Sequence, residues 1–70
     1  MRVSQLLHAM YKDDEIVIED FDAPVNKAII YNGSVRGIKR DNPVNKMHIK
    51  CVCAKNDTTF VLAAKQRERR

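Results

Sequence analysis

The stretch with the most potential for chemistry runs from Asp13 to Asp22 and holds six of the nine carboxylates in this 70-residue chain. Its centre, Ile16-Val17-Ile18, predicts a strand, because β-branched residues are frequent in strands. At about 3.3 Å per residue, the acids at the two ends of that strand lie about 20 Å apart. Only Asp20 and Asp22 share a single turn, where two carboxylates can bind Mg²⁺ or Ca²⁺ if further oxygen ligands join them. This pair is the one candidate metal site, but the dispersed charges favour a solvated strand rim, so we expect no cofactor.

The cysteines and histidines do not follow a metal-binding spacing. Cys51 and Cys53 are one residue apart, whereas zinc sites use pairs with a two-residue spacer. On a strand their Cα atoms would lie about 6.5–7 Å apart, at or beyond the limit for a disulfide. We therefore expect two buried free thiols in a reducing, cytoplasmic compartment. His48 is expected on the opposite face of the same strand, and His8 on a helix.

A catalytic constellation is not evident in this sequence. Nucleophilic catalysis needs an activated serine or cysteine beside a base, and Ser4 and Ser34 have no such local pattern. A glycine-rich phosphate loop is missing too, since the chain has only two glycines, Gly33 and Gly37. We expect no catalytic residue and a protein that is not an enzyme.

Charge is distributed unevenly along the chain. Residues 1–22 hold two basic and six acidic residues, which gives −4, and residues 23–70 hold eleven basic and three acidic, which gives +8 and a net charge of +4. Such polarity fits an acidic protein surface, the phosphates of nucleic acid, or self-association. The residues expected to contact a partner are Arg36, Lys39, Arg40, Lys46, Lys50, Lys55, Arg67, Arg69 and Arg70.

The elements that must position these side chains begin with a short helix. Apolar residues from Val3 to Met10 recur at i, i+3, i+4 and i+7, with Ser4 as N-cap, and we expect the helix to end near Tyr11. A strand over residues 15–19 follows. Alternating residues 47–54 and the apolar run 59–63 predict an antiparallel hairpin.

Residues 28–38 allow two interpretations. Asn32-Gly33 is the strongest short hairpin signal and would divide the segment into two strands. Alternatively the segment is one bent strand with a bulge at Gly33, which we favour. The fold class is then α+β, with an N-terminal helix packed on a four-stranded, mainly antiparallel sheet, or a five-stranded one with the hairpin. We expect one domain over residues 1–64, a charged tail over 65–70, and a core of Leu6, Leu7, Met10, Ile16, Ile18, Ile30, Val35, Ile49, Cys51, Phe60 and Leu62.

The order of these pieces resembles a group of very short proteins of bacteria, phages and mobile elements. The matching residues are VSQLL at Val3–Leu7, DDEIVIEDFD at Asp13–Asp22 and IYNGSVRGI at Ile30–Ile38, within a similarity that covers most of residues 1–64. The Y-x-G-x-V core recurs in that group without asparagine before the glycine, which favours the single strand. This chain departs from many of those proteins by its basic charge.

The resemblance implies a fold and a setting, because no activity is established for the group. It implies a non-catalytic accessory protein that engages a host protein, for example as an inhibitor of a host defence such as a CRISPR nuclease. The alternatives are a nucleic-acid-binding module that uses the basic second half, and a metal-dependent nuclease that uses Asp20 and Asp22. A 70-residue chain buries a modest fraction of its surface, so we also expect a homo-oligomer, and we expect no membrane association.

Overall fold

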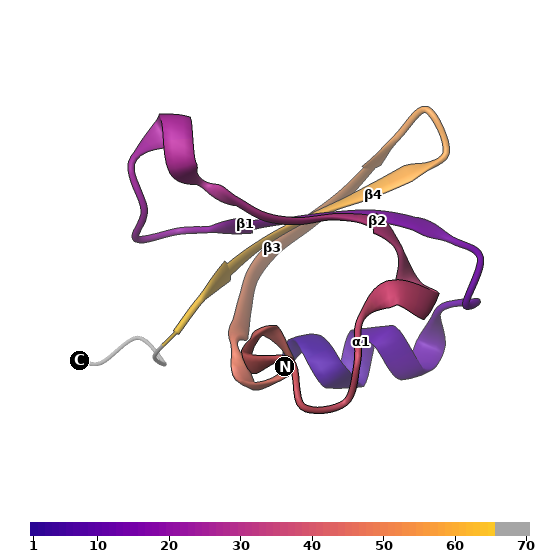
Figure 1. Ribbon diagram of the computed structural model, residues 1–70. Helices are drawn as coiled ribbons and strands as arrows, with labels where there is room; N and C mark the ends of the chain where they lie inside the picture. The colour runs from indigo at the N-terminus through magenta and orange to yellow at the C-terminus, as the bar shows by residue number, and fades with distance from the viewer. Residues whose placement is uncertain (66–70) are drawn as a thin grey trace.

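The computed structural model describes residues 1–65 and confirms the α+β class (Figure 1). Arg67, Arg69 and Arg70 lie outside the described residues. One helix precedes four strands: α1 (Val3–Ala9), β1 (Glu15–Asp20), β2 (Ile29–Ser34), β3 (His48–Lys55) and β4 (Thr58–Ala64). Single-turn 3₁₀ helices lie in the connections at Val25–Lys27, Val35–Gly37 and Pro43–Lys46. No helix in this part of the chain is long and apolar enough to cross a membrane.

The four strands form one mixed sheet in the order β2-β1-β4-β3. β1 pairs antiparallel with β2 and parallel with β4, and β3 pairs antiparallel with β4. The predicted hairpin is therefore confirmed, and its turn residues Asn56 and Asp57 have φ of 52° and 64°, the positive values that tight hairpin turns require. In Figure 1, α1 and the segment after β2 lie on the same side of the sheet.

Asn32 and Gly33 lie inside β2, so the hairpin interpretation of residues 28–38 is wrong. β2 is also shorter than the strand over residues 28–38 that we favoured, because a 3₁₀ helix begins at Val35. The bulge in β2 does not lie at Gly33, where it was expected. Ile18 pairs with Tyr31 but Glu19 pairs with Ile29, which leaves Ile30 as the extra residue.

Tyr31 explains why this segment carries two glycines. Its hydroxyl donates a hydrogen bond of 2.6 Å to the Ser34 carbonyl, so the ring reaches along the strand toward the following turn. A Cβ atom on Gly33 would lie 3.2 Å from the Tyr31 Oη, and one on Gly37 would overlap that atom. The segment from Tyr31 to Gly37, which extends the Y-x-G-x-V pattern by two residues, therefore encodes a local packing arrangement in which two glycines make room for a tyrosine side chain.

The start of α1 differs from the prediction. The helix begins at Val3, which places Ser4 inside its first turn, so the Ser4 N-cap is wrong. The N-cap is Arg2, and its N–H donates a hydrogen bond of 2.8 Å to the Gln5 side chain. The Val3 N–H donates to the Met47 carbonyl at 2.9 Å, which ties the helix start to the approach to β3.

The core lies between α1, the segment after β2 and one face of the sheet. Ile16, Ile18 and Val35 are buried as predicted. Leu6, Leu7, Met10 and Ile49 are partly buried and pack against that cluster. The remaining predictions are wrong, because Ile30 and Cys51 are exposed and Phe60 and Leu62 are only half-buried. The positions that replace them are Val3, Val44, Met47, Val61 and Ala63.

A bulge in β3 causes the largest of these errors. Ile49 pairs with Ala63 and Cys51 pairs with Leu62, although Ala63 and Leu62 are neighbours in β4. Successive residues of a strand point to opposite faces, so Ile49 and Cys51 lie on opposite faces despite their spacing of two. Ile49 packs on the core, whereas Cys51 and Cys53 are exposed free cysteines and not the buried thiols expected.

Candidate binding groove

A shallow groove of about 490 Å³ lies between α1 and the segment that follows β2. Side chains from two parts of the chain, widely separated in sequence, form its walls. The lining residues are Ser4, Leu7, His8, Met10, Lys12, Val35, Arg36, Ile38, Arg40 and Asn45. The groove is thus a product of the tertiary structure.

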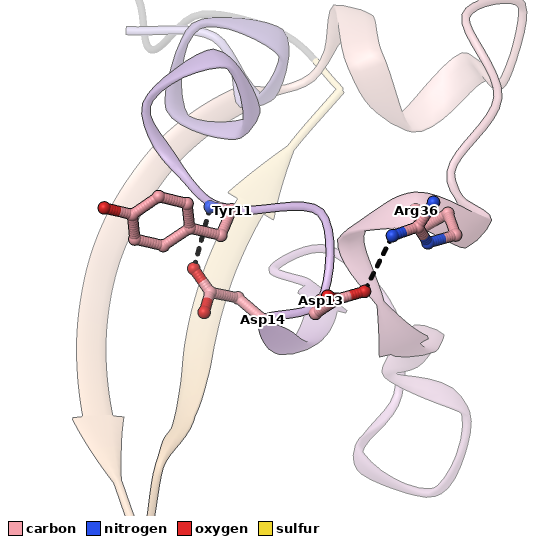
Figure 2. A network of polar contacts seen from close by, with 4 residues as sticks. All are labelled: Tyr11, Asp13, Asp14 and Arg36. Carbon is pink, nitrogen blue, oxygen red and sulfur yellow. Dashed lines mark hydrogen bonds and ion pairs between the residues drawn. The ribbon is translucent and has the colours of Figure 1, made fainter.

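Backbone hydrogen bonds hold the two walls at a defined distance. The Val35 N–H donates to the Asp14 carbonyl and the Arg36 N–H to the Lys12 carbonyl, both at 2.9 Å. Figure 2 shows the ion pair that accompanies them, in which Arg36 Nη2 lies 2.8 Å from Asp13 Oδ1. Both side chains of this pair are mostly exposed, so the pair orients Arg36 but contributes little to stability.

The turn that follows α1, from Tyr11 to Asp14, is closed by the Asp14 carboxylate. The Tyr11 N–H donates to Asp14 Oδ2 at 2.9 Å (Figure 2). The Asp14 N–H donates in turn to the Tyr11 carbonyl at 3.1 Å. Aspartate forms such bonds readily, because its short side chain reaches nearby backbone groups. Two of the clustered acids thus have local structural roles beside the groove.

Two asparagines shape the second wall. The Asn42 side chain accepts a hydrogen bond of 2.9 Å from the Val44 N–H and caps the 3₁₀ turn. Asn45 Nδ2 lies 2.7 Å from the Lys39 carbonyl and 3.1 Å from the Arg40 carbonyl. These bonds fold the loop between Ile38 and Val44 back on itself and hold Arg40 at the groove.

The groove combines an apolar floor with cationic edges. Leu7, Met10, Val35 and Ile38 supply its apolar surface, and Lys12 and Arg40 supply positive charge beside Arg36, which is paired with Asp13. None of its lining residues is an acid. Such a surface fits a partner with carboxylates around an apolar anchor, because the anchor gains from burial while the charges select its sign.

The structure does not gather the predicted basic residues into one patch. Arg36 and Arg40 line the groove, and the neighbouring Lys39 is exposed beside them. Lys46 ends the 3₁₀ turn that leads to β3. Lys50 lies on β3, with its Nζ 4.8 Å from the centroid of the Phe21 ring. Lys55 is at the far end of β3, beside the hairpin turn that Figure 1 shows away from α1.

Asp20 and Asp22 are joined by no further histidine, cysteine or acidic metal ligand among the residues that the structure describes. Asp20 Oδ1 accepts a hydrogen bond of 2.9 Å from the Asp22 N–H, so one carboxylate stabilises the turn after β1. Among residues 1–65, no three histidine, cysteine, aspartate or glutamate side chains come together as a metal would require. The local arrangement is that of an aspartate turn.

Of the ten lining residues, only Arg36 and Arg40 were expected to contact a partner, and the polar residues missed in the N-terminal part include His8 and Lys12. Both precede the acidic stretch, and the net charge of residues 1–22 is negative, which drew attention to the second half of the chain. His8 lies on α1 four residues after Ser4, which also lines the groove, whereas Lys12 lies in the turn after the helix. The helical spacing of Ser4 and His8 was the available signal, and it does not extend to Lys12.

Comparisons with known proteins give no family for this chain. No family model, no curated protein and no solved structure matches it. The groove must therefore be interpreted from its own chemistry.

Proposed function

We propose that this protein is a non-catalytic binding protein that engages an acidic segment of a host protein through the groove. The observation that carries the proposal is the combination of a ten-residue lining free of acids with an apolar floor. A bare cationic patch would select phosphate equally well. The floor of Leu7, Met10, Val35 and Ile38 adds apolar area that only a partner with an apolar anchor would bury.

The setting of this proposal comes from the resemblance to short phage and mobile-element proteins. In that setting the partner is a protein of the bacterial host, and a defence nuclease such as a CRISPR nuclease is one candidate. The groove requires that such a partner present an acidic segment, because electrostatic complementarity then sets the rate and selectivity of association.

A capture experiment with matched charge variants tests the proposal. Tagged wild-type protein, Arg40→Glu and Lys55→Glu would each be incubated with nuclease-treated bacterial lysate. The two substitutions change the charge equally, but only Arg40 lines the groove. We expect a protein retained by the wild type and by Lys55→Glu to be lost with Arg40→Glu. Equal retention by all three would exclude the groove as the binding surface.

Nucleic-acid binding is the second candidate, favoured by the net charge of +4. Phosphate contacts give an affinity that falls steeply with salt concentration. Fluorescence anisotropy with a labelled single strand and a labelled duplex, at low and at moderate salt, would measure it. Binding to either probe that is weakened similarly by Arg40→Glu and Lys55→Glu would favour dispersed phosphate contacts over the groove. No binding at low salt would remove this candidate.

A further inference from the structure

β3 is a terminal strand of the sheet, and its outer edge is only partly covered. The N-terminal residues cover the beginning of that edge. The Val3 N–H donates to the Met47 carbonyl, and the Ile49 N–H donates to the Met1 carbonyl at 2.8 Å. Beyond this point, no described residue pairs with the outer edge at Val52 or Ala54.

The pairing pattern shows which backbone groups face this edge. The Ala63 carbonyl accepts a hydrogen bond of 2.7 Å from the Phe21 N–H, so Ala63 directs its backbone groups toward β1. Backbone groups alternate along a strand, so Leu62 and Phe60 face β3. Their partners Cys51 and Cys53 bond to them, which leaves the N–H and C=O groups of Val52 and Ala54 facing outward.

The exposed part of the strand has the composition of a pairing surface. Cys51, Val52, Cys53 and Ala54 are all exposed and uncharged, and the strand contains no proline. Proteins usually protect a free edge with central charges, proline or a covering element. Here the lysines stand only at the two ends of this stretch, at Lys50 and Lys55.

We propose that β3 pairs antiparallel with β3 of a second copy of this chain, around a twofold axis at Val52. Val52 then faces Val52 of the second copy and exchanges two backbone hydrogen bonds with it. Cys51 lies opposite Cys53 of the second copy, and the reverse pair forms across the axis. The two sheets become one continuous eight-stranded sheet.

A second copy fits this edge for reasons of length and charge. The covered start at Ile49 and the turn after Lys55 bound the free edge, and Val52 lies at its middle. In antiparallel pairing, residues opposite one another have side chains on the same face of the sheet. Since side chains alternate between faces along a strand, the twofold axis must pass through a residue position and not between two residues. With the axis at Val52, Lys50 opposes Ala54 and Lys55 opposes Ile49, so no lysine opposes a lysine.

This register makes a specific statement about the two cysteines. The Cys51–Cys53 pair between copies is a non-hydrogen-bonded pair, with Cα atoms about 4.5 Å apart, inside the range that a disulfide can bridge. Cys51 and its own Cys53 lie about 6.5–7 Å apart, and two Cys51 residues across the axis about 8 Å apart. Only the mixed pair is well placed for a disulfide.

Diamide treatment of single-cysteine variants tests the register. Diamide takes up the two thiol hydrogen atoms as the sulfur–sulfur bond forms. Cys51→Ser and Cys53→Ser, carrying tags of different mass, would be oxidised separately and as a mixture at the same total concentration. We expect a covalent dimer of mixed mass in the mixture and a loss of cross-linking in each variant alone. The proposal would be overturned if one variant alone cross-linked as much as the mixture, or if no covalent dimer formed in any sample.

Amide hydrogen exchange provides a readout that needs no substitution. We expect the Val52 and Ala54 amides to exchange on the order of tenfold more slowly at high than at low protein concentration, because only pairing protects them. The Cys51 and Cys53 amides are bonded to β4 and should not respond. Val52→Pro removes an outward donor without breaking a bond to β4 and should abolish the effect and the dimer, whereas Val52→Thr keeps the donor and should retain both. Concentration-independent exchange at Val52 would contradict the pairing.

Discussion

Tyr31 and Gly37 should be strongly coupled in their effect on stability. A Cβ on Gly37 would overlap the Tyr31 hydroxyl, but the next nearest atom, the Tyr31 Cζ, lies 3.5 Å from that Cβ. Gly37→Ala should therefore force a shift when the hydroxyl is present and meet only ordinary contact when it is removed. Tyr31→Phe removes that hydroxyl and little else.

The expected free energies follow from these contacts. Tyr31→Phe loses the 2.6 Å bond to the Ser34 carbonyl, at a cost of about 1 kcal/mol. Gly37→Ala alone gains about 0.4–1 kcal/mol from the unfolded chain but loses about 1–3 kcal/mol to overpacking. In the double variant the overpacking is removed, and the stabilisation that Gly37→Ala provides by restricting the unfolded chain remains. We expect the double variant to be about as stable as Tyr31→Phe or more stable, with a coupling of about 2 kcal/mol.

Urea unfolding of the wild type, both single variants and the double variant measures this coupling. All four should be compared at one low protein concentration, because association would add to apparent stability. With a slope of about 1 kcal/mol per molar urea, the coupling corresponds to a shift of about 2 M between the additive and the observed midpoint. Tyr11→Phe is the control, since Tyr11 is 82% exposed and its change should be nearly neutral. Additivity within about 0.5 kcal/mol would refute the packing role of the two residues.

Three other predictions concern the core, the exposed ion pair and the thiols. Ile16→Ala removes a fully buried side chain and should cost about 2–5 kcal/mol in urea unfolding, enough to unfold much of a domain this small; a cost below about 1 kcal/mol would contradict the described core. Asp13→Ala breaks an exposed pair with Arg36 and should change stability by no more than about 1 kcal/mol, as thermal unfolding at low and high salt would show. At a protein concentration too low for association, Cys51 and Cys53 should both react with a thiol reagent in the native, reduced protein at the rate seen in urea, and slow reaction of either would indicate burial within the chain.

The fold class was predictable because its signals are local. The stripe from Val3 to Met10 and the β-branched run around Ile16 each specify an element within a few residues. The hairpin of β3 and β4 was predictable for the same reason. Ser4 was misassigned because the N-cap is Arg2, a residue type with no preference for that position, and Gln5 at the third helical position bonds its N–H.

The candidate site was only partly predictable. Arg36 and Arg40 were among the expected contact residues, and both line the groove. Lys12 was not among them, since it reaches the groove only through the hydrogen bond between its carbonyl and Arg36. Lys55 belongs to the same charge pattern in sequence but lies at the other end of β3, because a charge pattern carries no information on direction in space.

The sequence by itself determined one helix, the strand at DDEIVIEDFD, the closing hairpin and the spread of acids to the two ends of a strand. Periodicity and β-branching suffice for these features, since each depends on neighbours within one element. The tertiary structure alone decided which residues lie on each face of the sheet, how the groove forms and which strand edge is free. One extra residue in β3, between Ile49 and Cys51, turned both thiols outward. Pairing between strands sets such a bulge, and pairing is a contact between residues far apart in the chain.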